Sequence, residues 1–227
     1  MERINKKPII IEFNGLPGSG KTTIAKALKM KLESLNYDSL LWYDKSKLLR
    51  NPRLFFFMPQ YWSALQSAFS YSKLLPNRNY TNRILTTITF IRMYHGFVNS
   101  GRKDILLRDQ GIVQSIVSWA HTDLLPDSER LTDFLNLMHL EDLPLLIVNC
   151  HVSEVVSNSR IEARPFNGCR VETMDKSDRL KTLEVQTTNF SFIRDVIKNK
   201  CQKLKIIDIN TDMSIEDNVN LIIKQVS

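Results

Sequence analysis

Residues 15–22 read Gly15-Leu16-Pro17-Gly18-Ser19-Gly20-Lys21-Thr22, which matches the pattern G-x-x-x-x-G-K-[ST]. An apolar run over residues 9–13 precedes this stretch and predicts a buried strand, and residues 22–35 after it predict a helix. In such a turn the backbone N–H groups point inward around a hollow the size of a phosphate. The helix N-terminus adds roughly half a positive charge there. The stretch therefore predicts a phosphate-binding loop.

The side chains of this loop have expected roles. Lys21 would reach the β- and γ-phosphates of a nucleoside triphosphate, and the hydroxyl of Thr22 would hold Mg²⁺. The residues expected to bind the nucleotide here are Gly15, Pro17, Gly18, Ser19, Gly20, Lys21, Thr22 and Thr23. We therefore predict that the chain uses ATP and Mg²⁺.

The composition bounds the class of protein. A chain of 227 residues that is 43% hydrophobic corresponds to one domain, or to one domain with an insertion. No apolar run approaches the ~20 residues of a membrane span, and residues 1–7 do not resemble a signal peptide. The cysteines, Cys150, Cys169 and Cys201, form no metal-binding pattern with the histidines. We therefore expect a cytoplasmic protein with reduced cysteines.

Strand-like apolar runs alternate with helical patterns along the chain. This alternation predicts an α/β fold with a five-stranded parallel sheet flanked by helices. The expected strands span residues 8–13, 38–43, 105–108, 144–149 and 204–209. The expected helices span about 21–36, 112–120, 128–141, 153–163, 177–199 and 214–226.

The connection from 45 to 103 has an unusual composition. It contains ten Lys and Arg residues, no Asp or Glu, and eleven of the twenty aromatic residues of the chain. A crossover between parallel strands needs only about a dozen residues. The surplus therefore predicts a helical insertion between strands two and three, over the strand ends where open α/β sheets bind ligands.

Three interpretations of this insertion stay open. It is a lobe that binds the acceptor, with Arg78, Arg83 and Arg92 contacting the substrate, or it is a surface for a partner. A partner here would be a second copy in a homodimer or nucleic acid, with which the net charge of +7 is compatible. The third interpretation is contact with a membrane surface.

Two further groups carry the expected chemistry. Asp109 follows the strand at 105–108 and lies beside the phosphate-binding loop, where it could bind the metal through water or accept a proton. The alternative for Asp109 is a cap for the helix that begins near Ile112. Arg160 and Arg164 are spaced i, i+4 and would share one helix face. They suit the charge that develops on a transferring phosphate, and the alternative for them is a solvated face paired to Glu162 or Glu154.

The core of the chain, about residues 8–44 and 104–226, resembles the P-loop small-molecule kinases of the thymidylate kinase, deoxynucleoside kinase and adenylate kinase group. Residues 15–23 resemble their phosphate loop, and the segment Arg108-Asp109-Gln110-Gly111 resembles the Asp-Arg or Glu-Arg motif after their third strand. The pair Arg160-x-x-x-Arg164 resembles their lid arginines. Residues 206–210 resemble their last strand and adenine-side loop.

This resemblance implies a single P-loop NTPase domain over 1–227, with the insertion at 45–103 and a lid at 160–175. It implies that Asn210 and Thr211 lie near the base, and that Asp44 acts as a base on an acceptor hydroxyl. Gln110 stands where the family has Arg, and we expect it to contact the acceptor. By strand alternation, Arg108 should point to the opposite side of the sheet from Asp109.

The implied activity is ATP-dependent transfer of the γ-phosphate to a nucleotide, a nucleoside or another hydroxyl compound. The alternative is a P-loop ATPase or nucleotide-dependent switch that acts on a protein or nucleic acid. A GTPase-type switch would carry Asn-Lys-x-Asp, and the chain has Gln202 in place of that acid. The acceptor, the preferred triphosphate and the oligomeric state stay open.

Overall fold

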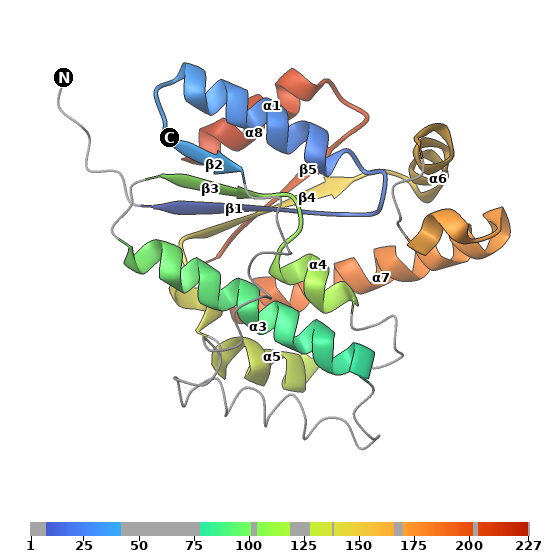
Figure 1. The fold of residues 1–227 in the computed structure, drawn as a ribbon, viewed down its shortest axis with the longest axis horizontal. Coiled ribbons are helices and arrows are strands. Elements are labelled where there is room, and N and C mark those ends of the chain that lie inside the picture. The colour runs from blue at the N-terminus through green and yellow to red at the C-terminus, as the bar shows by residue number, and fades with distance from the viewer. Residues whose placement is uncertain are drawn as a thin grey trace.

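Five parallel strands form the centre of the described part of the chain in a computed structural model, which covers residues 8–41, 78–100, 104–118, 128–137, 139–165, 170–201 and 204–226 (Figure 1). The strands are β1 (Ile9–Asn14), β2 (Ser39–Leu41), β3 (Ile105–Arg108), β4 (Leu145–His151) and β5 (Lys205–Asn210). Their order across the sheet is β2-β3-β1-β4-β5. The central strand β1 pairs with β3 along one edge and with β4 along the other, and four of its six residues are apolar.

Helices cover both faces of the sheet (Figure 1). One face carries α1 (Lys21–Ser34) and α8 (Ile215–Val226). The other carries α3 (Arg78–Asn99), α4 (Ile112–Val117), α5 (Ser128–Leu137) and α7 (Lys176–Lys200). Helix α6 (Glu154–Ala163) lies beyond the end of the sheet against α7, and two short 3-10 helices, η3 (Leu140–Asp142) and η4 (Arg170–Thr173), complete the described elements.

The alternation of side chains along β1 separates two hydrophobic clusters. Ile11 and Phe13 pack with α1 and α8. Ile10 packs in the cluster of α3, α4, α5 and α7. Because successive side chains of a strand point to opposite faces, Glu12 and Asn14 also lie on the α3 and α4 face. Two polar side chains of the central strand are thus buried on that face, each with 0% exposure.

The predicted parallel sheet is confirmed, and the differences from the expected elements are local. The helix expected over 128–141 is interrupted, because α5 ends at Leu137 and His139 has a left-handed backbone with φ 50°. The first helix ends at Ser34, and Asn36 beyond it is also left-handed. Of the connection 45–103, the structure describes α3 and the residue after it; Asp44 lies outside the described residues. Within the described ranges, no helix is long and apolar enough to cross a membrane.

Candidate active site

The phosphate-binding loop is held closed by its own lysine. The Lys21 ammonium donates to the carbonyl oxygens of Gly15 at 2.8 Å and Leu16 at 2.6 Å, and to the Ser19 hydroxyl at 3.3 Å. The Lys21 side chain is therefore folded back along the loop, and the residue is 8% exposed. This arrangement places a cation at the N-terminus of α1, where backbone N–H groups also collect.

The outer side of the loop rests on α6. Gly18 has φ 79°, and a Cβ atom there would lie 2.9 Å from the carbonyl oxygen of Ser157, so glycine is required at this position. The Ser157 hydroxyl donates to the carbonyl oxygen of Pro17 at 2.6 Å. Leu16 is buried in a small cluster with Ile161, Val171 and Leu183. The loop is thus packed against α6, η4 and α7.

Asp109 reaches the phosphate-binding loop from the neighbouring strand. The Thr22 hydroxyl donates to the Asp109 carboxylate at 3.0 Å. Arg108 points to the opposite face, as strand alternation predicts, and its guanidinium lies 4.2 Å from the ring centroid of Phe90 on α3. A hydroxyl and a carboxylate side by side are oxygen donors of the kind that Mg²⁺ binds, so Thr22 and Asp109 fit the metal expected here.

The first turn of α4 is capped by Glu12 of β1 and not by Asp109, so the capping alternative for Asp109 is wrong. The cap residue Gly111 offers no side chain. The Glu12 carboxylate instead accepts from the N–H groups of Ile112 and Val113, both at 2.8 Å, and from the Tyr94 hydroxyl at 3.2 Å. Burial raises the pKa of Glu12, while these hydrogen bonds and the charge of Arg108 act in the opposite direction.

Sequence reasoning missed Glu12, although a signal was present. Glu12 is an acid within an otherwise apolar run at the centre of the sheet. A buried carboxylate needs hydrogen-bond partners, and the partners of Glu12 lie about one hundred positions further along the chain. The position of Glu12 in the sequence therefore indicates that it has hydrogen-bond partners, but it does not indicate which residues these are.

A cavity of about 1040 Å³ lies along the phosphate-binding loop, α3, α4, α6, η4, α7 and the start of α8. Among the described residues its charged lining side chains are Lys21, Arg160 and Arg164, and these with Thr22 and Thr211 form what we call the cationic side. What we call the neutral side is lined by Thr86, Phe90, Gln110, Gly111, Gln114, Ser115 and Ser118. The cavity therefore has a positively charged part and an uncharged part within one space.

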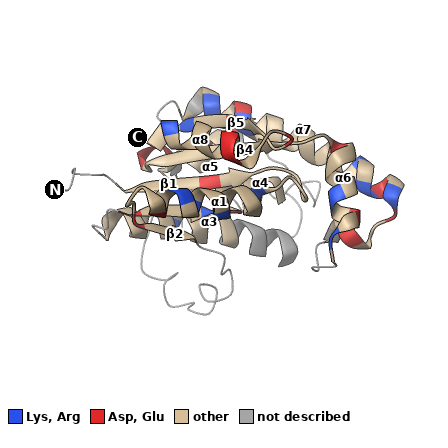
Figure 2. Ribbon diagram, turned by 90° about the horizontal axis from the view of Figure 1, so that it is seen from above, with Lys and Arg blue, Asp and Glu red and all other residues tan. Residues whose placement is uncertain are grey.

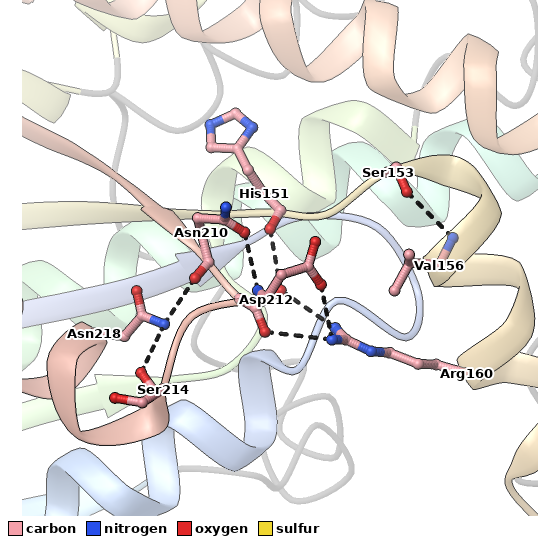
Figure 3. A network of polar contacts seen from close by, with 9 residues as sticks. His151, Ser153, Val156, Arg160, Asn210, Asp212, Ser214 and Asn218 are labelled. Carbon is pink, nitrogen blue, oxygen red and sulfur yellow. Dashed lines mark hydrogen bonds and ion pairs between the residues drawn. The ribbon is translucent and has the colours of Figure 1, made fainter.

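The two arginines at the C-terminal end of α6, Arg160 and Arg164, reach different partners. Arg160 extends from α6 to the turn after β5, where it donates to the Thr211 hydroxyl and carbonyl at 3.3 Å each and pairs with Asp212 at 3.0 Å (Figure 3). Arg164 lies just beyond α6 in an extended conformation and pairs with Glu172 at 2.7 Å. Because Arg164 lies beyond α6, the expectation that the two arginines share one helix face is wrong. The alternative, a solvated face paired to Glu162 or Glu154, is also wrong, because the partners are Asp212 and Glu172 and both side chains line the cavity.

Charged residues of both signs lie beyond the end of the sheet, as they do on other helices of the fold. Figure 2 shows Lys, Arg, Asp and Glu interspersed around α6 and the adjoining end of α7, whereas the strands are mostly uncharged. Arg179 of α7 contributes to this region, donating to Asn158 at 3.3 Å and to the carbonyl oxygen of Met174 at 2.9 Å. These contacts join α6, the segment after η4 and α7 around the cationic side.

Some expected site residues lie elsewhere. Arg92 is half-buried on α3 and is not among the residues that line the cavity. The Asn210 side chain accepts from the N–H of Asp212 at 2.9 Å and does not line the cavity, whereas Thr211 does. For Arg78 and Arg83 the structure describes the helical backbone alone.

The thiol of Cys150, which packs beside Gly15 of the loop, is not suited to nucleophilic chemistry. Burial raises the pKa of Cys150 to about 12, although the charge of Lys21 opposes this effect. A thiol with such a pKa stays protonated and unreactive. Among the described residues, no group of three or more His, Cys, Asp or Glu could hold a metal ion without other ligands.

No protein-family model matches the sequence, and no curated protein matches it. The structure is similar to a deoxyadenosine kinase from M. mycoides with the products dCMP and dCDP bound, with a TM-score of 0.51 and 14% sequence identity. It is also similar to a structure of deoxyadenosine kinase from M. mycoides with bound dATP, with a TM-score of 0.50 and 17% identity. Each comparison covers 96% of this chain and 98% of the other. At these identities the likeness concerns the fold, which is the P-loop NTPase fold.

Proposed function

We propose that the chain transfers the γ-phosphate of ATP to a hydroxyl group of an uncharged, nucleoside-like acceptor. The observation that carries this proposal is a cavity that combines a cationic side and a neutral side. A triphosphate needs cations and N–H groups, and an uncharged acceptor needs an aromatic surface and neutral hydrogen-bonding groups. The solved structures of similar fold are of a deoxyadenosine kinase, which supports the same class of acceptor.

The donor nucleotide would lie along the phosphate-binding loop. Lys21 would turn from the loop carbonyls to the β- and γ-phosphates, and the N–H groups of the loop would bind the same oxygens. Thr22 and Asp109 would hold Mg²⁺, which neutralises the charge that grows on the phosphates during transfer. Thr211 lines the cavity at the end of β5 and is the candidate for contact with the base.

The acceptor would lie against α3 and α4. Phe90 offers a ring on which a planar base can stack, and Gln110 and Gln114 offer amides within the same cavity. The described lining of this side carries no charge, which favours a nucleoside over a nucleotide. A hydroxyl acceptor needs a group that takes its proton, and we assign this role to Asp44, a residue outside the described ranges.

The lid would complete the cationic side. Arg160 and Arg164 lie over the loop, and their charges suit the phosphate in transfer. We propose that residues 160–175 change their contacts when both substrates bind, exchanging Asp212 and Glu172 for phosphate oxygens. Such closure would also exclude water and limit hydrolysis of ATP.

A transfer screen tests the proposal. The purified chain is incubated with ATP and Mg²⁺ and with nucleosides, their monophosphates, sugars or aminoglycosides, and the products are identified by mass spectrometry. We expect phosphorylation of one or more nucleosides and little of the matched monophosphates, and none with Lys21→Ala. Hydrolysis of ATP without any acceptor, stimulated by a nucleic acid or protein, would contradict the proposal and favour a switch ATPase.

A further inference from the structure

The Glu12 carboxyl group joins three elements beneath the neutral side. It belongs to β1, and it accepts hydrogen bonds from the first two N–H groups of α4 and from the hydroxyl of Tyr94 on α3. Glu12 and Tyr94 are both 0% exposed. The bonds therefore act without competition from solvent, and losing one leaves a buried group unsatisfied.

Asn14 continues this contact along the same face of β1. Its side-chain oxygen accepts from the N–H of Gln114 at 3.1 Å. The three consecutive N–H groups of Ile112, Val113 and Gln114 are thus all bound by side chains of one strand. A helix cannot satisfy these groups itself, so β1 supplies the cap that Gly111 lacks.

The turn before α4 is also held from its other end. Arg108 lies beside Glu12 in the strand register and donates from Nε to the carbonyl oxygen of Gln110 at 2.8 Å. A Cβ atom on Gly111 would lie 2.1 Å from the Glu12 carboxyl group, so the turn packs directly on that group. A displacement of the carboxyl group would therefore move the turn.

This turn carries the groups that face the two sides of the cavity. Asp109 begins it and reaches Thr22 at the phosphate-binding loop. Gln110 and Gln114 line the neutral side. We infer that Glu12 is a positioning residue that fixes the turn from Asp109 to Gln114. It thereby sets the position of Asp109, the proposed metal ligand, relative to the neutral side of the cavity. The catalytic consequence rests on the proposed function, whereas the positioning itself does not.

The variant Glu12→Gln tests this role with little change of shape. Its amide keeps one acceptor and turns an NH₂ group toward a backbone N–H. We expect kcat to fall about tenfold to a hundredfold, which is the range for one unsatisfied buried hydrogen bond. The acceptor KM should rise and the Kd of ATP measured without metal should stay as in the wild type. The Mn²⁺ concentration that half-saturates the complex with a non-hydrolysable ATP analogue should rise, because Asp109 moves from Thr22.

Leu131→Ala is the control for lost stability. Leu131 is fully buried on α5, in the hydrophobic cluster on the same face of the sheet, and does not line the cavity. It should lower Tm while kcat, KM and Mn²⁺ binding stay as in the wild type, with all assays at least about 15 °C below each Tm. If Glu12→Gln behaved like Leu131→Ala, the positioning role would be wrong.

Asn14→Ala keeps the test valid if Glu12→Gln does not fold. It removes one bond to the same turn and should cause a smaller change in the same direction in Mn²⁺ binding and in amide exchange at residues 112–114. Unchanged exchange and unchanged Mn²⁺ binding would overturn the inference. Both readouts need no acceptor, so a failed transfer screen would overturn the proposed function and leave this test intact.

Discussion

The two sides of the cavity are built in different ways. The cationic side combines a contiguous loop, which supplies Lys21 and Thr22 within residues 15–22, with Arg160, Arg164 and Thr211 from later segments. The neutral side comes from α3 and α4, which meet only in the folded chain. The difference teaches that the loop part of the cationic side is encoded locally, whereas the neutral side depends wholly on distant segments held in register. Substitutions on the two sides should therefore change different kinetic constants.

Lys21→Ala should produce the largest loss. Removing a cation that stabilises charge in phosphoryl transfer costs on the order of 10²-fold or more in kcat. The matched control is Lys26→Ala, an exposed lysine on the same helix. Steady-state kinetics and circular dichroism on both variants make the measurement. Full phosphotransfer by a folded Lys21→Ala protein would show that the cationic side does not bind the donor phosphates.

Asp109→Asn should rank second. The amide keeps the size of the side chain but loses the charge that binds the metal, so kcat should fall by about a hundredfold. The Mg²⁺ concentration at half-maximal rate should rise, and Tm should change little because Glu12 caps α4. Asp104→Asn, just before β3, is the control. A fall in Tm with intact kinetics would assign Asp109 a structural role.

Arg164→Ala should have an intermediate effect that still belongs to the cationic side. A charge-assisted contact contributes about 1.5–3 kcal/mol, so kcat should fall roughly tenfold to a hundredfold with little change in ATP binding to the open state. Hydrogen exchange across residues 150–165 and 170–175, with and without an ATP analogue, measures closure directly. Constant protection together with wild-type kcat would remove the lid from the proposal.

Gln114→Ala should have the smallest effect, and it should change the acceptor KM and not kcat. Loss of one neutral hydrogen bond costs about 1 kcal/mol, so the acceptor KM should rise several-fold while kcat and the KM of ATP stay unchanged. The bond from its backbone N–H to Asn14 does not need the side chain. Gln225→Ala, on α8 away from the cavity, is the control. A rise in the KM of ATP instead would mean that the two sides are not separate.

Contiguity decided how much could be predicted from the sequence. The loop at residues 15–22 and the parallel sheet could be predicted from the sequence, because each motif or hydrophobic pattern lies within one continuous segment. Asp109 was singled out because it directly follows a strand, and the structure places it in contact with Thr22, while its role stays a prediction. The partners of Arg160 and Glu12 were not found. Arg160 meets Asp212 and Glu12 meets Ile112, pairs separated by 52 and 100 positions, and no local pattern encodes such distances.

The packing of Leu16 has a consequence for how the protein responds to heat. Leu16 forms a small cluster with Ile161, Val171 and Leu183, apart from the two large clusters of the sheet. Small peripheral clusters open at lower free energy than a sheet core. The tip of the phosphate-binding loop is therefore anchored to one of the weaker parts of the molecule. On warming, nucleotide affinity should disappear several degrees before the sheet melts, so thermal inactivation would precede unfolding.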